Sequence, residues 1–394
     1  MLRDDVRAAM EATLAEIAES GLLKTEQQIV TPQGALIGTA AGELINLCAN
    51  NYLGLANDPA VVSAAARTLH ERGFGMASVR FIAGTQDIHR ELEEAISALL
   101  RTDDTILFPS CFDANGAVFE TLLGPDDAVV SDELNHASII DGIRLSKARR
   151  FRYRNRDMGD LREQLAAAAA GGGRILVVTD GVFSMDGYLA PLREICDLAE
   201  EFGAMVMVDD SHAVGFVGES GAGTPELFGV VDRVDVVTGT LGKALGGGSG
   251  GYVSASSPVV ALLRQRGRPY LFSNAVPPAI VGGSLEALAQ VRSGKDARER
   301  LRRNADLFRS LMAEAGFDLL EGEHPIIPVM IPDARDAVAM ADALRRRGVY
   351  VTAFSYPVVP LGRSRLRVQI SAAHTEEELR RAAEQFVAAR EELA

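Results

Sequence analysis

One lysine, Lys243, lies in a segment of small residues that would let its amine meet a flat ligand. The segment reads Thr238-Gly-Thr-Leu-Gly-Lys243-Ala-Leu-Gly-Gly-Gly-Ser-Gly-Gly251 and follows an apolar run typical of a strand. Glycine has no side chain and tolerates unusual backbone dihedrals, so this segment can approach a ligand closely. A lysine shielded from water is more readily neutral, and a neutral amine can attack a carbonyl to form a Schiff base. The pattern indicates covalent chemistry at Lys243.

Two nucleotide-binding motifs are also rich in glycine, but neither fits this segment. A P-loop needs a glycine five residues before Gly242, where the chain has Val237. It also needs a serine or threonine directly after Lys243, where the chain has Ala244. The glycine spacing of a dinucleotide-binding fold is present at Gly246, Gly248 and Gly251. That fold also needs a carboxylate for the ribose, and residues 252–285 contain no Asp or Glu. Both alternatives are excluded.

An acidic residue and a histidine follow the preceding apolar run, in Val208-Asp209-Asp-Ser-His212. The carboxyl end of a strand is where α/β sheets bind ligands, and a carboxylate there can pair with a protonated pyridine nitrogen. His212 could hydrogen-bond a phenolic oxygen on the same ring. Taken alone, Asp209 is typical of a helix cap and His212 is typical of a loop histidine. The lysine segment that follows them favours a ligand-binding role for both residues instead. Together they indicate a site for pyridoxal 5'-phosphate, with Lys243 as its Schiff-base lysine.

Further positions carry groups suited to the rest of such a site. Residues 110–116 follow one apolar run and precede a helical pattern, and a helix amino terminus can bind phosphate with help from the hydroxyls of Thr240 and Ser273. His136 follows another run and has a flat imidazole that can lie over a ring. Arg367 has the guanidinium that a substrate carboxylate requires. Each of these alone is typical of an ordinary turn, cap or surface residue.

Strands must position these residues, and short apolar runs precede most of them. Each run is bounded by Gly, Asp or Ser, as strands buried on both faces of a parallel sheet are. The expected strands of this sheet are residues 105–108, 128–130, 174–179, 204–208 and 234–238. Helical periodicity between them, as at 192–202, completes an α/β pattern. We expect a helix and arm over 1–50, a large domain over 51–285, and a smaller α+β domain over 286–394 with strands at 326–330, 349–351 and 366–370.

Composition disfavours several other classes of protein. The 394 residues carry a net charge of −14, which argues against a nucleic-acid surface, and no apolar stretch approaches the roughly 18 residues that span a bilayer. The spacing of Cys48, Cys111 and Cys196 indicates reduced thiols of a cytoplasmic protein, and we find no metal-binding motif. A basic run over residues 147–156 is either a solvated edge or dimer-contact strand, or a contact for an anionic substrate such as coenzyme A.

From about residue 20 onward the chain resembles the α-oxoamine synthase family of fold-type-I pyridoxal phosphate enzymes. The motifs that carry the resemblance are Asn50-Asn-Tyr-Leu-Gly-Leu55, Asp209 with His212, Thr240-Leu-Gly-Lys243 and Arg365-Leu-Arg367. Longer segments are similar to the branch that uses glycine and acetyl-CoA, namely residues 73–87, 110–115, 135–142, 268–274 and 356–360. One departure is Ala83, where a cysteine is expected, and nothing in the chemistry depends on it.

The resemblance implies three groups of site residues. Those that hold the cofactor ring are Lys243, Asp209 at the pyridine nitrogen, Ser184 and His212 at the phenolic oxygen, and the stacking His136. Those that hold the phosphate are the amides of Cys111 and Phe112, the hydroxyl of Thr240, and Ser273 and Asn274 of the partner subunit. Those that bind substrate are Arg367 at the carboxylate, His136 and Asn50. The site would then lie at a homodimer interface.

The activity that the resemblance implies is acyl transfer dependent on pyridoxal phosphate. The enzyme would condense glycine with acetyl-CoA to 2-amino-3-oxobutanoate and coenzyme A, and the reverse reaction would serve threonine degradation. One alternative is a sibling like 8-amino-7-oxononanoate synthase, with a longer acyl-CoA or another amino acid, since a methylene is worth only about 1–3 kcal/mol of discrimination. A second alternative is a regulator that senses pyridoxal phosphate. It would need a DNA-binding segment before the fold, for which the motif at Asn50 leaves no room.

Overall fold

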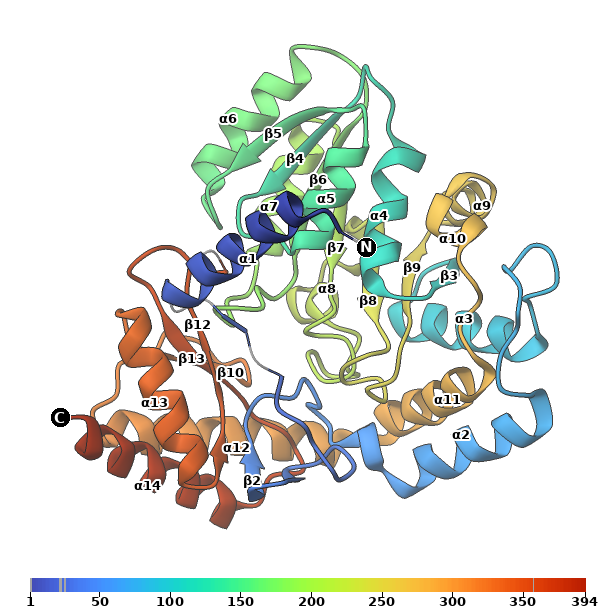
Figure 1. Cartoon of the computed structure of the whole chain (residues 1–394). Helices are drawn as coiled ribbons and strands as arrows, with labels where there is room; N and C mark the ends of the chain where they lie inside the picture. Colours follow the sequence, from blue (N-terminus) through green and yellow to red (C-terminus); the bar gives the residue numbers. More distant parts are fainter. Residues whose placement is uncertain (1, 21–22, 25, 357) are drawn as a thin grey trace. The chain divides into compact units, whose positions relative to one another are not determined.

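The computed structural model describes residues 2–20, 23–24, 26–356 and 358–394, which form two compact units (Figure 1). The larger unit comprises Asn50–Arg302 and Ser371–Ala373. The smaller unit comprises residues 1–49, 303–370 and 374–394. The expected division into 1–50, 51–285 and 286–394 stays a prediction.

A seven-stranded sheet forms the centre of the larger unit, in the order β3-β9-β8-β7-β6-β4-β5. Its strands are β3 (Asp104–Phe108), β4 (Ala128–Asp132), β5 (Arg149–Tyr153), β6 (Ile175–Asp180), β7 (Met205–Asp209), β8 (Val236–Thr240) and β9 (Gly251–Ala255). Neighbouring strands from β5 to β8 run parallel, and β9 runs antiparallel to both β8 and β3. The expected mostly parallel sheet is confirmed. Two of its strands, β5 and β9, come from the basic run and from the end of the glycine-rich segment, neither of which has the apolar pattern.

Helices cover both faces of this sheet, because its strands alternate their side chains between two apolar cores. Along β6, Leu176 and Val178 enter one core, while Ile175 and Val177 enter the other. The first core is closed by α4 (Cys111–Leu122), α5 (Ala137–Leu145), α9 (Ser257–Arg266) and α10 (Arg268–Phe272). The second is closed by α6 (Met158–Ala169) and α7 (Leu192–Glu201). The other helices of the unit are α2 (Pro59–Arg72), α3 (Asp87–Leu100), α8 (Thr224–Phe228) and α11 (Pro278–Ser293), of which α2, α3 and α11 pack together (Figure 1).

The smaller unit contains two three-stranded sheets. One has the order β1 (Leu36–Thr39), β2 (Gly42–Asn46) and β11 (Val349–Tyr350), and the other is antiparallel in the order β10 (Ile326–Met330), β13 (Arg365–Gln369) and β12 (Thr352–Phe354). Its helices are α1 (Asp4–Glu19), α13 (Ala334–Arg346), α14 (Glu376–Leu393) and the part of α12 (Lys295–Glu314) from residue 303 on. The strand expected at 349–351 is observed as β11, which pairs with β2, and a separate strand that was not expected, β12, follows it and pairs with β13. Within the described ranges, no helix has the length and apolarity needed to cross a bilayer.

Candidate active site

A cavity of about 230 Å³ lies at the carboxyl ends of the parallel strands of the larger unit. Seven of the residues expected from the sequence line it, namely Cys111, Phe112, His136, Asp209, His212, Thr240 and Lys243. The remaining lining residues are Ser110, Ser138, Asp180, Val182 and Ser211. These side chains come from four different strand ends and one helix start, so the parallel topology gathers residues that are far apart in the sequence.

Helix α4 begins at the cavity, and its start is fixed by the strand beside it. The side-chain oxygen of Ser110 caps the helix by accepting a hydrogen bond from the amide of Asp113 at 3.1 Å. A Cβ atom on Gly251 would lie 2.2 Å from the amide nitrogen of Cys111, so only glycine lets β9 approach the turn this closely. The first amides of a helix have no partner within it and carry a partial positive charge, which suits an anion.

Asp209 is held in place by neighbouring donors. One carboxylate oxygen accepts a hydrogen bond from the side-chain amide of Asn115 at 2.7 Å, and the other accepts from the backbone amide of Ser211 at 3.0 Å. Asn115 is fully buried, and its own side-chain oxygen accepts from the hydroxyl of Thr238 at 2.8 Å. The sequence placed Asn115 only in a phosphate-binding segment, yet its i, i+4 relation to Cys111 puts both on one face of α4.

His136 belongs to the same chain of hydrogen bonds. Asn115 donates its second amide hydrogen to the hydroxyl oxygen of Ser138 at 2.8 Å, and that hydroxyl lies 2.7 Å from Nδ1 of His136. Because the oxygen of Ser138 accepts from Asn115, its hydrogen is available for His136, so Nδ1 is an acceptor and a neutral ring carries its proton on Nε2. The path from His136 to Asp209 through Ser138 and Asn115 could not be read from sequence spacing.

His212 meets a buried phenol from the opening motif of the larger unit. The hydroxyl of Tyr52 lies 2.8 Å from Nδ1 of His212, and Tyr52 is fully buried with its ring packed on Phe216 at a centroid distance of 4.6 Å. This contact commits Nδ1 to the protein. Tyr52 was part of the family motif, but no role followed for it from the sequence.

A second carboxyl, Asp180, lines the cavity beside Asp209. The two residues are direct partners in the register of β6 and β7. Burial, reinforced by the charge of Asp209, raises the pKa of Asp180 well above its ordinary value. Its Oδ1 also accepts a hydrogen bond from the backbone amide of His136 at 3.3 Å. Asp180 therefore stays neutral at a higher pH than an ordinary carboxyl.

The other expected residues lie outside the lining of the cavity. Ser184 is in the turn after β6, while Ser273 and Asn274 directly follow α10. Asn50 opens the larger unit, and its buried side-chain oxygen has no hydrogen-bond partner among the described residues. Arg367 lies on β13 of the smaller unit.

Arginines of the basic run are engaged within the larger unit. Arg149 donates to the carbonyls of residues 168 and 172, and Arg150 donates to those of residues 144 and 146. Arg154 pairs with Asp157 at 2.9 Å. These contacts, together with the position of β5 at the sheet edge, favour the interpretation as an edge strand.

Comparisons with known proteins agree with this geometry. Residues 42–386 match the family described as aminotransferase class I and II. The 2-amino-3-ketobutyrate coenzyme A ligase of Escherichia coli K12 is 57% identical over 93% of this chain and 92% of its own length. The 8-amino-7-oxononanoate synthase of Thermosipho melanesiensis is 44% identical over 94% of each chain. A solved structure of SPT with a PLP internal aldimine superposes with a TM-score of 0.94 at 31% identity, covering 99% of both chains.

The chain therefore belongs to the aminotransferase class I and II family and has the fold-type-I architecture of its pyridoxal phosphate enzymes. Within that class its relatives place it in the α-oxoamine synthase family.

The groups around the cavity fit pyridoxal 5'-phosphate. The cofactor presents a carbonyl, a phosphate and a basic ring nitrogen, and the cavity offers the amine of Lys243, the start of α4 and the carboxylate of Asp209. In the part of the chain that the structure describes, no group of His, Cys, Asp or Glu could hold a metal ion.

Proposed function

We propose that this chain is a pyridoxal phosphate-dependent glycine C-acetyltransferase, an activity also named 2-amino-3-ketobutyrate CoA ligase. It condenses glycine with acetyl-CoA to 2-amino-3-oxobutanoate and coenzyme A, and the reverse reaction serves threonine degradation to glycine. The observation that carries the proposal is the cavity that unites Lys243, Asp209 and the start of α4. The 57% identity to the E. coli ligase supports glycine and acetyl-CoA as the substrates.

The chain's own residues supply the proton transfer and the orientation. When bound, the cofactor provides a ring that stabilises negative charge at the Cα of the amino acid. The amine of Lys243 accepts the Cα proton of glycine, a general-base step worth about 10²–10⁴-fold in rate. Cα then bonds to the acetyl carbonyl carbon, the thioester C–S bond breaks, and coenzyme A takes up a proton and leaves as its thiol. Asp209, fixed by Asn115 and Ser211, directs its carboxylate at the ring nitrogen.

The remaining contacts divide between the ring, the phosphate and the substrate. The cofactor ring would be held by His212 and Ser184 at its phenolic oxygen and by His136. The phosphate is bound by the amides of Cys111 and Phe112 and by the hydroxyl of Thr240. The substrate is bound by Arg367 at the glycine carboxylate, together with Asn50, and by His136.

We place the working enzyme in a homodimer in the cytoplasm. Ser273 and Asn274 of the partner subunit complete the phosphate site, so each site is shared. Phe272, which directly precedes Ser273, is exposed in the single chain, and so are Phe74 and Phe81. Exposed apolar side chains of this kind are typical of an interface. The three cysteines lack disulfide partners, which suits a reducing compartment.

A sibling activity is the second candidate, because the synthase of T. melanesiensis is 44% identical. It would use a longer acyl-CoA, or alanine or serine in place of glycine. An assay of thiol release distinguishes the two candidates, with acetyl-, succinyl- or pimeloyl-CoA as the acyl donor and glycine, alanine or serine as the amino acid. We expect a clear preference for glycine with acetyl-CoA, and a preference for alanine with pimeloyl-CoA would contradict the proposal.

Substitution of Lys243 tests the chemistry directly. We expect Lys243→Ala to lose the yellow colour of the holoenzyme and to lower the rate of 2-amino-3-oxobutanoate formation by at least about 10³-fold, since it removes both the attachment point and the base. The exposed Lys147→Ala is the matched control and should retain both properties. A Lys243→Ala protein that kept its colour and full turnover would show that another residue holds the cofactor.

A further inference from the structure

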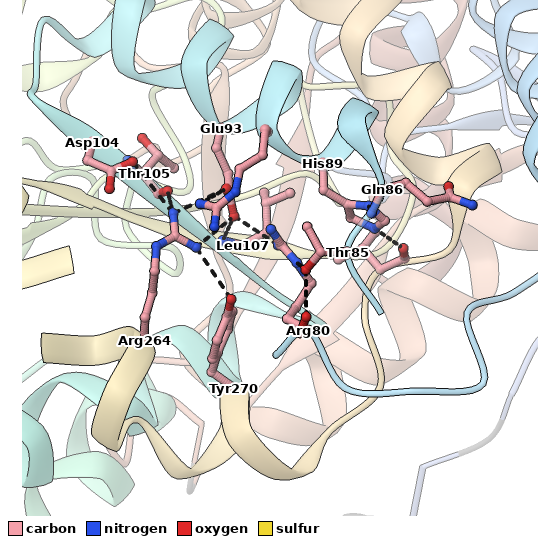
Figure 2. Close-up of polar contacts among 12 residues, drawn as sticks. Arg80, Thr85, Gln86, His89, Glu93, Asp104, Thr105, Leu107, Arg264 and Tyr270 are labelled. Atoms are coloured by element: carbon pink, nitrogen blue, oxygen red, sulfur yellow. Dashed lines mark hydrogen bonds and ion pairs between the residues drawn. The ribbon is translucent and has the colours of Figure 1, made fainter. Parts of the chain in front are cut away.

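A buried carboxylate in the larger unit gathers three arginines from three separate places in the sequence (Figure 2). Glu93 on α3 accepts from Arg80 at 2.8 Å, from Arg90 at 2.9 Å and from Arg264 on α9 at 3.1 Å, and its side chain is 1% exposed. The amide of Leu107 on β3 also donates to it, at 3.1 Å. These groups lie outside the cofactor cavity.

Two of these arginines hold the residue that anchors α10. The guanidinium of Arg264 donates to the hydroxyl of Tyr270 at 3.4 Å, and the guanidinium carbon of Arg80 lies 5.8 Å from the centroid of the same ring. Tyr270 is buried, and three residues later the chain reaches Ser273. Glu93 thus fixes the chain on the amino-terminal side of Ser273 and Asn274.

The carboxyl-terminal side of the same segment is held by neighbours of the network. The amide of Ala275 donates to the carbonyl of Ser78 at 3.1 Å, and Nε2 of His89 lies 2.8 Å from the carbonyl of Val276. Nδ1 of His89 accepts from the amide of Gln86 at 3.1 Å, so the ring's proton is on Nε2 and is donated to that carbonyl.

The loop that contributes Arg80 is itself closed by side-chain bonds. The Nε of Arg80 donates to the hydroxyl oxygen of Thr85 at 3.0 Å, and that hydroxyl donates back to the carbonyl of Arg80 at 2.6 Å. Within the loop, a Cβ on Gly84 would lie 2.5 Å from the carbonyl oxygen of Ser78. The loop therefore presents Ser78 to the segment in a defined position.

A contribution to folding stability does not by itself explain why this buried network of charges is present. The buried Nη2 of Arg80 has no hydrogen-bond partner among the described residues, which carries a desolvation cost. Replacing a buried ion cluster by apolar residues is often neutral or stabilising, so a cluster of this kind is better explained when it also defines a geometry. Here the arginines contact Tyr270 at one end of the short segment 270–276, and Ser78 and His89 beside the network hold its other end.

We propose that Glu93 is a positioning residue, which through Arg80, Arg264 and Tyr270 sets the place of Ser273 and Asn274 for cofactor phosphate binding in the partner subunit. The inference rests on the proposed phosphate contacts of those two residues. Glu93 acts at a distance and meets neither the cofactor nor the substrate.

The test is the dissociation constant of pyridoxal phosphate, titrated into the apo dimer and followed by absorbance. We expect Glu93→Gln to weaken binding about tenfold, the size of one lost charge-assisted hydrogen bond. The matched control is Asp87→Asn, which also converts a carboxylate on α3 to an amide but breaks an exposed pair with Arg72 at 3.0 Å. The control should bind the cofactor as the unaltered chain does. A Glu93→Gln dimer that melts at a lower temperature yet binds with unchanged affinity would overturn the proposal.

A double-mutant cycle that combines Glu93→Gln with the paired change Ser273→Ala and Asn274→Ala tests the positioning role separately from the phosphate contacts on which it rests. If Glu93 acts through the segment, its effect should largely vanish in the Ser273→Ala, Asn274→Ala background, whereas full additivity would exclude the coupling. If Ser273→Ala and Asn274→Ala leave the affinity unchanged, the phosphate contacts themselves are wrong and the positioning role is excluded with them. If Glu93→Gln fails to fold, Tyr270→Phe is judged by the same cycle and the same outcomes.

Discussion

The hydroxyl of Tyr52 determines which nitrogen of His212 can serve a ligand. It occupies Nδ1 at 2.8 Å inside a fully buried contact, so the imidazole cannot turn without leaving a phenol unsatisfied. A histidine that binds a phenolic oxygen has to present one ring nitrogen in a fixed protonation state. Tyr52 thus fixes the orientation of the His212 ring.

Removing that hydroxyl should change the cofactor's absorbance spectrum while leaving the fold intact. We expect Tyr52→Phe to move the pH midpoint of the holoenzyme's absorbance and to lower kcat/KM about tenfold, because His212 loses its orientation. The control is Tyr252→Phe, since the buried hydroxyl of Tyr252 has no hydrogen-bond partner among the described residues. The prediction fails if both variants show the same titration curve as the unaltered chain.

Residues of the site could be predicted where a single segment carries the signal. Lys243 is surrounded by glycines, and Asp209 and His212 follow a strand end together, so each pattern is local. Tyr52, Asn115 and Asp180 could not be assigned in this way. Their roles arise from contacts across more than 25 residues of sequence, which only the fold brings together.

At the scale of elements, strands with continuous apolar runs could be predicted and the others could not. β6 and β7 are buried on both faces and have the expected composition. β5 lies at the sheet edge and carries arginines, while β9 begins in a glycine-rich segment. Both strands are specified by their neighbours in the sheet more than by their own sequence.

The proposed phosphate site depends on one feature at the scale of elements, the close approach of β9 to the start of α4. We expect Gly251→Ala to push the first turn of α4 away from the cavity, because its Cβ would lie 2.2 Å from the amide nitrogen of Cys111. The affinity for pyridoxal phosphate should fall at least about tenfold, with a loss of about 1–3 kcal/mol in stability.

A glycine within α4 itself, Gly116, provides the control for this prediction. A Cβ on Gly116 meets nothing within 4 Å, so Gly116→Ala should leave the affinity unchanged and stabilise the helix by about 0.5–1 kcal/mol. Unchanged cofactor binding in Gly251→Ala, measured in the same titration, would mean that the start of α4 is not part of the phosphate site.

At the scale of the whole molecule, the buried carboxyl of Asp210 couples stability to pH. It is fully buried, and it accepts from the amide of Thr224 at 2.8 Å and from the hydroxyl of the same residue at 2.6 Å. Burial raises its pKa from the ordinary 3.8 to about 7. The folded chain therefore retains this proton at pH values where the unfolded chain has released it, and the associated stability is present below pH 4 and lost as the pH rises to 7.

Asp210→Asn removes this titration while preserving the shape of the side chain and a pair of bonds to Thr224. Relative to the unaltered chain, we expect the variant to gain stability between pH 4 and pH 8, by at most about 4 kcal/mol, because the neutral amide never has to be buried as an anion. The midpoint of urea unfolding, followed across this range, measures the effect. The exposed Asp141→Asn should track the unaltered chain at every pH. Parallel curves for Asp210→Asn and the unaltered chain would mean that Asp210 is charged in the folded state throughout, because its bonds to Thr224 then outweigh the cost of burial.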